Sequence, residues 1–547
     1  MGVTRRTVLT SAVAGSAFAA LAAGELARAR ASSASPVGDV VGKITVGYQG
    51  WFACPGDGAP INAWWHWSNN WSQPPSPSNN VILAWPDMRE YARGYQTAYQ
   101  NLNGGGPATL FSSFDQQTID THFRWMQQHG CDTAALQRFN PNSSEGPTRD
   151  AMAVKVRSAA ETFGCKFYIM YDVTGWASMQ SEIKTDWTSK MSAHVGSGAY
   201  ARQNGKPVVC IWGFGFNDNN HPWDANTCLD VVNWFKGQGC YVIGGVPREW
   251  RTGVGGSRAG FSDVYHAFHM LSPWMVGAIS TAADSDWMYQ NINLPDVADC
   301  TAHGIDYQPC VLPGDVSARQ RAHGDFMWRQ FYNMVRVGAQ GIYISMFDEY
   351  GEGNQIAKTA ETQAMVPAGS GLLALDEDGT ACSSDYYLRL TADGGRMLKG
   401  QIPLTSTRPT QPVIPASSVV SLRSHANGRY VCAESAGTQP LIANRTAIGS
   451  WEQFDLIDLS GGNVALRSHA NGRYVCAENW GTQPLIANRT AIGLWETFQL
   501  IRNPDGSVSL KALVNNNYVC AENAGTSWLV ANRTAIGSWE QFDLITG

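Results

Sequence analysis

Three copies of one 44-residue pattern follow one another near the end of the chain, and this repeat constrains the fold more than any other feature. Residues 422–432 return unchanged at 466–476 and in a degenerate form at 510–520. Each copy continues with Ala-Glu and Ala-Asn-Arg-Thr-Ala-Ile-Gly, and it ends with Trp-Glu-x-Phe. A unit of short alternating strands and glycine turns cannot bury a face alone. Three such units closing around a pseudo-threefold axis predict an all-β β-trefoil over residues 418–547.

Within each repeat, the Tyr-Val-Cys-Ala-Glu and Trp-Glu-x-Phe motifs resemble the fascin-like trefoil family, and the Gln-x-Trp signature of the ricin-type family is missing. In a secreted chain, the resemblance implies a carbohydrate-binding module with up to three sites. The aromatic and acidic residues expected at these sites are Tyr430, Glu434, Tyr474, Glu478, Tyr518 and Glu522. The repeated Trp451, Trp495 and Trp539 are interpreted as trefoil core.

A proline-rich stretch at 401–417 precedes the repeats and is predicted to be an extended linker. Before it, residues 40–400 alternate apolar strand-like runs with segments of helical periodicity, for example helices at 116–129, 148–163, 225–236 and 325–336. The eight candidate strands are 44–51, 133–139, 166–172, 207–213, 240–247, 264–274, 305–313 and 341–347. This alternation predicts an α/β domain with a (β/α)8 TIM-type barrel, whose chemistry lies at the carboxyl ends of the strands.

The first 35 residues are predicted to be a twin-arginine signal peptide. Arg5 and Arg6 precede a mild apolar run at 11–24 and Ala-x-Ala cleavage patterns. A membrane anchor is not expected, because the run is short and Arg28 and Arg30 follow it closely. The mature protein is therefore expected to be secreted, soluble and monomeric.

Composition narrows the function classes. The formal net charge is -6 and only 15% of residues are charged, which excludes a generally basic nucleic-acid binder and a polybasic membrane patch. The twelve cysteines are too sparse for a disulfide scaffold. Cys300 and Cys310 are a plausible local bridge, whereas the three repeated cysteines are not expected to pair with one another.

Three carboxylates stand within five residues directly after the last predicted strand: Asp348, Glu349 and Glu352. Like charges so close raise one another's pKa, so one group can stay protonated while another is ionised. That difference is what a general acid and a general base require. An exposed acidic turn or a weak calcium loop is the alternative, and the position at a barrel strand end disfavours both.

The stretch Glu349-x-x-Glu352-Gly353-x-Gln355-Ile356 resembles the Glu-Trp-His-Glu-Gly-Thr-Gln-Ile signature of glycoside hydrolase family 99, the endo-α-mannosidases and endo-α-mannanases. The segment 350–352 equally resembles the Asp-Tyr-Gly-Glu of family 71, the α-1,3-glucanases. Residues 47–52, 64–67, 137–139 and 272–274 are similar to bacterial family 71/99-like proteins.

The resemblance implies that Glu349 is the first catalytic carboxylate and Glu352 the acid/base, with no metal and no cofactor. Asp348 stands where family 99 has Asn, and Tyr350-Gly351 replace Trp-His, so α-mannoside specificity does not follow from the motif. The polar and aromatic residues near predicted strand ends that we expect to line the substrate cleft are Tyr48, Trp51, His66, Trp67, Arg138, Asp172, Trp212, Arg248, Trp250, Trp274 and Asp348.

The expected function is a glycoside hydrolase acting internally on an α-linked polysaccharide of the α-mannan or α-1,3-glucan class. Two alternatives stay open at this point. A non-catalytic polysaccharide-binding or adhesion protein is disfavoured by the presence of both glutamates, and a transglycosylase would differ only in how well the site excludes water.

Overall fold

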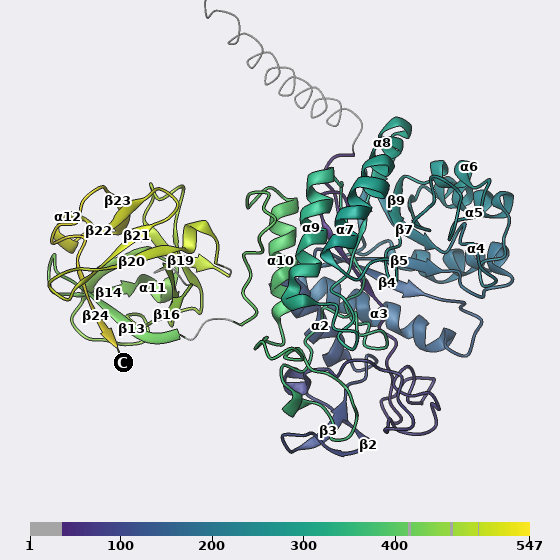
Figure 1. Cartoon of the computed structure of the whole chain (residues 1–547), viewed down its shortest axis with the longest axis horizontal. Coiled ribbons are helices and arrows are strands. Elements are labelled where there is room, and N and C mark those ends of the chain that lie inside the picture. The colour runs from purple at the N-terminus through teal and green to yellow at the C-terminus, as the bar shows by residue number, and fades with distance from the viewer. Residues whose placement is uncertain (1–34, 414–416, 460–462, 491, 547) are drawn as a thin grey trace, which may run out of the picture. The chain divides into compact units, whose positions relative to one another are not determined.

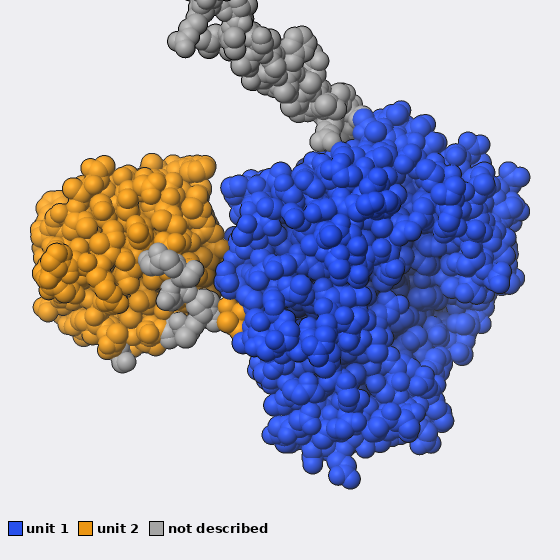
Figure 2. Space-filling view, in the orientation of Figure 1, with its two compact units in different colours: residues 1–412 blue, residues 413–547 orange. Residues whose placement is uncertain are grey.

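The computed structural model describes residues 35–413, 417–459, 463–490 and 492–546. It divides into two compact units, residues 1–412 and 413–547 (Figure 1; Figure 2). The predicted signal peptide lies outside the described residues except for Ser35. Within the described ranges, no helix combines the length and the apolar character needed to cross a membrane.

Unit 1 is built around a parallel β-sheet that closes on itself. Its strands, in sheet order, are β1 (Ile44–Tyr48), β4 (Thr133–Arg138), β5 (Lys166–Asp172), β7 (Lys206–Trp212), β8 (Tyr241–Val246), β9 (Met270–Pro273), the pair β10 (Asp306–Tyr307) and β11 (Cys310–Val311), and β12 (Ile342–Ile344). β10 pairs with β9, β11 pairs with β12, and β12 pairs with β1. Strands β1, β4 and β8 are buried along their whole length, as expected for a parallel sheet covered on both faces. This arrangement confirms the predicted (β/α)8 barrel.

Helices connect successive strands and cover the outside of the sheet (Figure 1). They are α2 (Gln116–Gln128), α3 (Gly146–Phe163), α4 (Met179–Ser189), α5 (Ala225–Gly237), α6 (Ser262–Ala267), α7 (Ala282–Met288), α8 (Leu294–His303), α9 (Asp325–Val337) and α10 (Tyr386–Leu398). The four helices predicted as examples correspond to α2, α3, α5 and α9 within two residues at each end. A hairpin of β2 (Tyr95–Asn101) and β3 (Pro107–Leu110) is inserted between β1 and α2.

The strand predicted at 264–274 is wrong over its first half. Residues up to Ala267 belong to α6, and only Met270–Pro273 forms a strand. Val264, Tyr265 and Phe268 are buried, and their spacing also fits one face of a helix. A short apolar run of this kind does not distinguish the two periodicities.

The predicted linker at 401–417 is largely not an extended spacer. Trp328 Nε1 donates to the carbonyl of Thr405 at 3.1 Å, and Arg408 forms an ion pair with Asp325 at 2.6 Å. Residues 401–412 therefore belong to unit 1, where they pack against α9 and α10. The sequence signal was the density of prolines, which shows that the backbone is extended but not whether it has a partner.

Unit 2 contains a second closed sheet, an antiparallel barrel of six strands. These are β13 (Ser417–Ser424), β16 (Phe454–Asp458), β17 (Asn463–Ser468), β20 (Phe498–Arg502), β21 (Val508–Ala512) and β24 (Phe542–Thr546), and β24 closes the ring on β13. Three hairpins complete it: β14 (Tyr430–Ala433) with β15 (Leu441–Arg445), β18 (Tyr474–Ala477) with β19 (Leu485–Arg489), and β22 (Asn517–Ala521) with β23 (Leu529–Arg533). The architecture confirms the predicted β-trefoil.

The three repeats use equivalent residues for equivalent contacts. The first asparagine of the Asn-Gly-Arg turn, Asn427, donates to the carbonyl of Ala443 at 2.8 Å, and Asn471 and Asn515 make the same contact in their own repeats. This contact explains why the third repeat keeps Asn515 although the two following residues differ.

All twelve cysteines are buried and unpaired. The local bridge suggested for Cys300 and Cys310 is therefore wrong, because both thiols are separately enclosed in the core of unit 1. The repeated Cys432, Cys476 and Cys520 do not pair with one another, as expected.

Candidate active site

The three carboxylates predicted as the site lie directly after β12, at the carboxyl end of the barrel. Asp348 is fully buried, and its two carboxylate oxygens accept hydrogen bonds from the backbone N–H groups of Gln49 and Gly50, each at 2.9 Å. Because β12 and β1 are neighbours in the sheet, these bonds join the ends of two strands that are about 300 residues apart. Asp348 was expected to line the cleft but is enclosed, and it joins the turn after β12 to the end of β1.

Glu349 is the most heavily perturbed carboxyl of the group. Its Oε1 accepts hydrogen bonds from the backbone N–H groups of Gly351 at 3.0 Å and Glu352 at 3.3 Å, and its Oε2 accepts one from the side-chain amide of Gln49. Burial, followed by the charges of Glu352 and Asp348, raises the pKa of Glu349 to about 8. Burial also raises the pKa of Asp348, to about 6, against the opposing effect of its backbone donors.

Glu352 is exposed at the surface of the same turn. Neighbouring atoms nevertheless crowd its carboxyl, and this loss of hydration, followed by the charge of Asp315, raises its pKa above the ordinary value. The turn therefore presents one enclosed carboxyl and one accessible carboxyl, both more basic than a free glutamate.

Trp51, two residues after Gln49, belongs to a cluster of stacked aromatic rings. The ring of Trp51 stacks on His66 with centroids 3.7 Å apart, and Phe139 stacks against Trp51 at 5.8 Å. Arg149 lies 4.3 Å from the centroid of Phe139 and is paired with Glu145 at 3.0 Å. Burial and the charge of Arg149 hold the pKa of His66 well below its usual range, so this imidazole is neutral.

Two further predicted residues, Trp212 and Trp274, lie at a small cavity inside the barrel. Trp212 and Trp274 meet edge to face at 5.4 Å, and both line this cavity. The cavity contains polar atoms that lack a protein partner, among them Trp212 Nε1 and Gln308 Oε1. Asp172 is the last residue of β5; it accepts hydrogen bonds from the N–H and hydroxyl of Thr174, and burial raises its pKa.

Four residues expected in the cleft lie in the core instead. The residues and their partners are Tyr48 with His122 at 3.0 Å, Trp67 with the carbonyl of Phe111 at 3.0 Å, Arg138 with Asp186 at 2.5 Å, and Trp250 with Asp296 at 3.0 Å. Each is buried, and the polar group of each already has a protein partner. Arg248 is half-buried and is paired with the adjacent Glu249.

Sequence reasoning missed Gln49 and Arg149 as parts of the site. Gln49 lies between the predicted residues Tyr48 and Trp51, directly after β1, but its contact with Glu349 depends on the pairing of β1 with β12. Arg149 lies in the first turn of α3, where nothing in the sequence distinguishes it from a surface arginine. Its side chain is buried among Trp51, Trp65 and Phe139.

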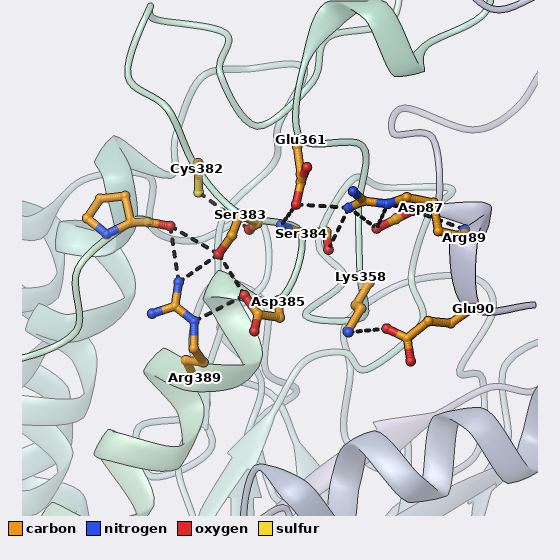
Figure 3. Close-up of polar contacts among 11 residues, drawn as sticks. Asp87, Arg89, Glu90, Lys358, Glu361, Cys382, Ser383, Ser384, Asp385 and Arg389 are labelled. Atoms are coloured by element: carbon orange, nitrogen blue, oxygen red, sulfur yellow. Dashed lines mark hydrogen bonds and ion pairs between the residues drawn. The ribbon is translucent and has the colours of Figure 1, made fainter. Parts of the chain in front are cut away.

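The segment after the site is fastened to unit 1 by ion pairs (Figure 3). Arg89 pairs with Asp87 at 2.6 Å and with Glu361 at 2.9 Å, and Lys358 pairs with Glu90. Further along, Arg389 pairs with Asp385 and donates to Ser383 and to the carbonyl of Pro412. These contacts hold the interior and the end of the long stretch between β12 and α10, which carries the glutamates near its start.

In unit 2, the predicted sugar-binding glutamates make the same contacts in each repeat. Every one of them is paired with an arginine and accepts from an asparagine ten residues later: Glu434 with Arg445 and Asn444, Glu478 with Arg489 and Asn488, and Glu522 with Arg533 and Asn532. Tyr430, Tyr474 and Tyr518 are half-buried at or next to the start of the preceding strand. These partners support a role for the glutamates in holding each hairpin.

Among the described residues, one group of side chains is close enough to share a metal ion: His266, Asp299 and His303. Both imidazoles already meet the same oxygen of Asp299, at 2.8 and 3.0 Å. The two rings are stacked at 3.6 Å and 17°. Lone pairs in nearly parallel ring planes do not converge on one ion, so this cluster is better described as a hydrogen-bonded triad than as a metal site.

Comparisons with known proteins give similarity of fold alone. No family model matches the chain, and no curated protein matches it. The endo-alpha-mannosidase of glycoside hydrolase family 99 from Bacteroides thetaiotaomicron aligns at 15% identity over 66% of this chain and 98% of its own, with a TM-score of 0.46. For the trefoil, the designed threefold protein ThreeFoil aligns at 24% identity over 23% of this chain and 97% of its own, with a TM-score of 0.22. The BEL beta-trefoil aligns at 16% identity over 25% of this chain and 98% of its own, also at 0.22.

Proposed function

We propose that unit 1 is a glycoside hydrolase in which Glu349 and Glu352 are the reacting carboxyls, and that unit 2 holds the polysaccharide substrate. One observation carries the proposal. At the carboxyl end of a (β/α)8 barrel, one turn presents a buried glutamate whose pKa is raised to about 8 and an accessible glutamate whose pKa is also raised.

Glycoside cleavage needs one proton donor and one proton acceptor, and the two carboxyls can supply both. Glu349 and Glu352 together hold two protons in acid, one proton in an intermediate range and none well above pH 8. Only the state with one proton has an acid for the leaving oxygen and a base for the attacking hydroxyl. Because the pKa of Glu349 is the one raised to about 8, the single proton lies mainly on Glu349, and the reactive form is the minor one in which the accessible Glu352 carries the proton and protonates the leaving group. The enclosed Glu349 is a strong base when ionised, and Gln49 orients it.

The aromatic residues near this turn are suited to hold sugar rings. Trp51 lies on the β1 side with His66 stacked on it, and Trp212 and Trp274 lie beside the central cavity. Flat apolar faces of this kind stack on the C–H face of a pyranose, while Asp172 offers an acceptor for hydroxyls. The α-linked class and internal cleavage are proposed from the motif around Glu349 and Glu352.

The proposal is tested by changing each glutamate to its neutral isostere. The full chain is incubated with α-mannan and with α-1,3-glucan, and new reducing ends are counted. Glu349→Gln and Glu352→Gln should each lower kcat by about 1,000-fold or more, since groups acting as a unit fail together. Glu161→Gln, an acid-to-amide change on the exposed side of α3, is the matched control and should hydrolyse like the parent. A parent that cleaves neither polymer, or a Glu349 or Glu352 variant that keeps parental activity, would contradict the proposal.

A further inference from the structure

At two surface positions the second trefoil repeat carries a large apolar side chain where the other two carry small residues. Trp480 stands where the first and third repeats have Ala436 and Ala524, and Leu494 stands where they have Ser450 and Ser538. The tryptophan is 62% exposed and the leucine 51% exposed. Near-identical repeats therefore carry small residues at two of three equivalent surfaces and large apolar residues at the third.

Folding gives no reason for a tryptophan at this position. The backbone there is left-handed in every repeat, with φ of +55° at Ala436, +59° at Trp480 and +51° at Ala524. Bulky side chains are disfavoured in this region of conformation. Since most of the Trp480 ring also faces water, the substitution adds strain and little burial, and a surface role accounts for it better than a packing role.

Trp480 forms an open aromatic corner with Trp495. The ring centroids are 5.7 Å apart and the planes are inclined at 59°, so neither ring covers the face of the other. Trp451 and Trp539 occupy the position of Trp495 in the other repeats, but their neighbouring loops carry alanine in place of Trp480. The corner is thus specific to the second repeat.

Hydrogen-bonding groups border this corner. Arg489 contacts Glu478 at 2.7 Å and Glu496 at 3.7 Å. These glutamates lie two residues before Trp480 and directly after Trp495. Equivalent charged groups exist in all three repeats, whereas the pair of tryptophans exists in the second repeat only.

We propose that unit 2 binds polysaccharide through the second repeat alone, with Trp480 stacking on one pyranose ring, Trp495 closing one side and the Glu478–Arg489 pair contacting hydroxyl groups. The inference rests on the proposed function, because the ligand is taken to be the substrate polymer. It replaces three equivalent sites with one. The patch is too small for a stable protein interface, which buries about 800 Å² on each partner, but it is large enough for one sugar ring.

The first experiment localises binding by chemical footprinting on the full chain. Mild oxidation of tryptophan is followed by peptide mass spectrometry, with and without α-mannan or α-1,3-glucan, and with cellulose as the β-linked comparison. One of the α-linked polymers should slow oxidation of Trp480 about tenfold. The exposed Trp528 of unit 2 and Trp287 of unit 1 are internal controls and should be unaffected. Equal protection of Trp480 and Trp528, or no protection by any polymer, overturns the inference.

The second experiment uses the repeats as their own control. Trp480→Ala restores the residue found in the other two repeats, so the fold should be retained. The affinity for the insoluble polymer, measured by co-sedimentation, should fall about tenfold. Trp528→Ala should leave binding unchanged. The double change Ala524→Trp with Ser538→Leu transfers the apolar pair to the third repeat and should strengthen retention through a second site.

A Trp480→Ala chain that binds like the parent overturns the inference, as does a parent whose self-association, but not glycan binding, depends on Trp480. The two proposals fail separately. Loss of hydrolysis in Glu349→Gln is read from reducing ends, while the role of Trp480 is read from binding and footprinting.

Discussion

Glu349 combines three hydrogen-bond donors with an environment that disfavours its charge. The donors are the backbone N–H groups of Gly351 and Glu352 and the amide of Gln49. These donors lower the pKa of Glu349, whereas burial and two acidic neighbours raise it. The second effect is larger, and the pKa is raised to about 8. The structure therefore maintains a proton on a carboxyl near neutral pH, at a cost to stability when that proton leaves.

The first prediction concerns the pH dependence of hydrolysis. The value of kcat/KM should follow a bell, because activity requires the pair to hold one proton. The alkaline limb should have an apparent pKa near 8, from Glu349, and the acid limb should lie above 4.5, since the pKa of Glu352 is raised from that value. Rates measured from pH 4 to 10 on the accepted polymer check this, and activity still rising at pH 9 would contradict it.

The second prediction concerns stability. In the unfolded chain Glu349 ionises near 4.5, whereas in the folded chain it ionises at about 8, so between these values the unfolded state binds fewer protons and the free energy of unfolding falls as pH rises. The slope is at most about 1.4 kcal/mol per pH unit. Glu349→Gln lacks this ionisation, so its stability relative to the parent should increase from pH 5 to pH 8 and then level off.

Thermal and urea melts of the full chain across that pH range measure the difference. Glu161→Gln, which is exposed, should follow the parent at every pH. Parallel curves for Glu349→Gln and the parent would show that the raised pKa is wrong.

At the residue scale, the sequence predicts Glu349 and Glu352 as the reacting carboxyls because they stand directly after the last apolar strand of the barrel, and the structure tests only where they lie. Whether a side chain at a strand end faces the cleft or the core depends on the pleat and on partners distant in sequence. For that reason Arg138 and Trp250 were expected in the cleft but are buried against Asp186 and Asp296.

At the element scale, the site depends on the junction between β1 and β12. Asp348 follows β12 and accepts two backbone N–H groups from the residues after β1. Asp348→Asn should break one of these bonds, because an amide offers a single acceptor oxygen and its NH2 group would face a donor. We expect a loss of about 1–3 kcal/mol of unfolding free energy and a fall in kcat, since Gln49 orients Glu349. Urea melts and reducing-end assays measure the two effects, and a variant with parental stability would contradict this role for Asp348.

Element positions followed from hydrophobic periodicity where the runs were long. The helix at 325–336 and the strand at 166–172 match α9 and β5 closely. The region 264–274 failed because a helix of six residues and a strand of four share one short apolar run. A hydrophobic pattern distinguishes a helix from a strand only over more residues than either element contains.

At the scale of the whole molecule, the two units should be separable, but only at the boundary that the structure shows. A chain ending after Pro412 keeps the contacts of residues 401–412 with α9 and α10, including Trp328 with Thr405 and Arg408 with Asp325. It should melt like unit 1 of the full chain and hydrolyse short soluble substrates equally well. A chain ending after Gly400 loses these contacts and should melt several degrees lower, for a loss of about 1–3 kcal/mol.

Thermal melts and activity of the two purified fragments check this prediction. Equal stability of both fragments would mean that residues 401–412 are a spacer after all. The repeat period made the trefoil predictable as a whole, whereas the boundary was not, because a proline-rich segment looks the same in sequence whether it is solvated or packed.

The pairing of β13 with both β16 and β24 sets the order in which unit 2 can assemble. Val420 of β13 lies opposite Phe454 on one side and Thr546 on the other. The first strand of the ring therefore cannot complete its pairing until the sixth strand is present. During synthesis the early repeats therefore expose unpaired strand edges until β24 emerges, and the two nearly identical repeats can meanwhile pair in each other's place. Refolding of unit 2 should accordingly be slow and all-or-none, with cooperativity that depends on one strand of five residues.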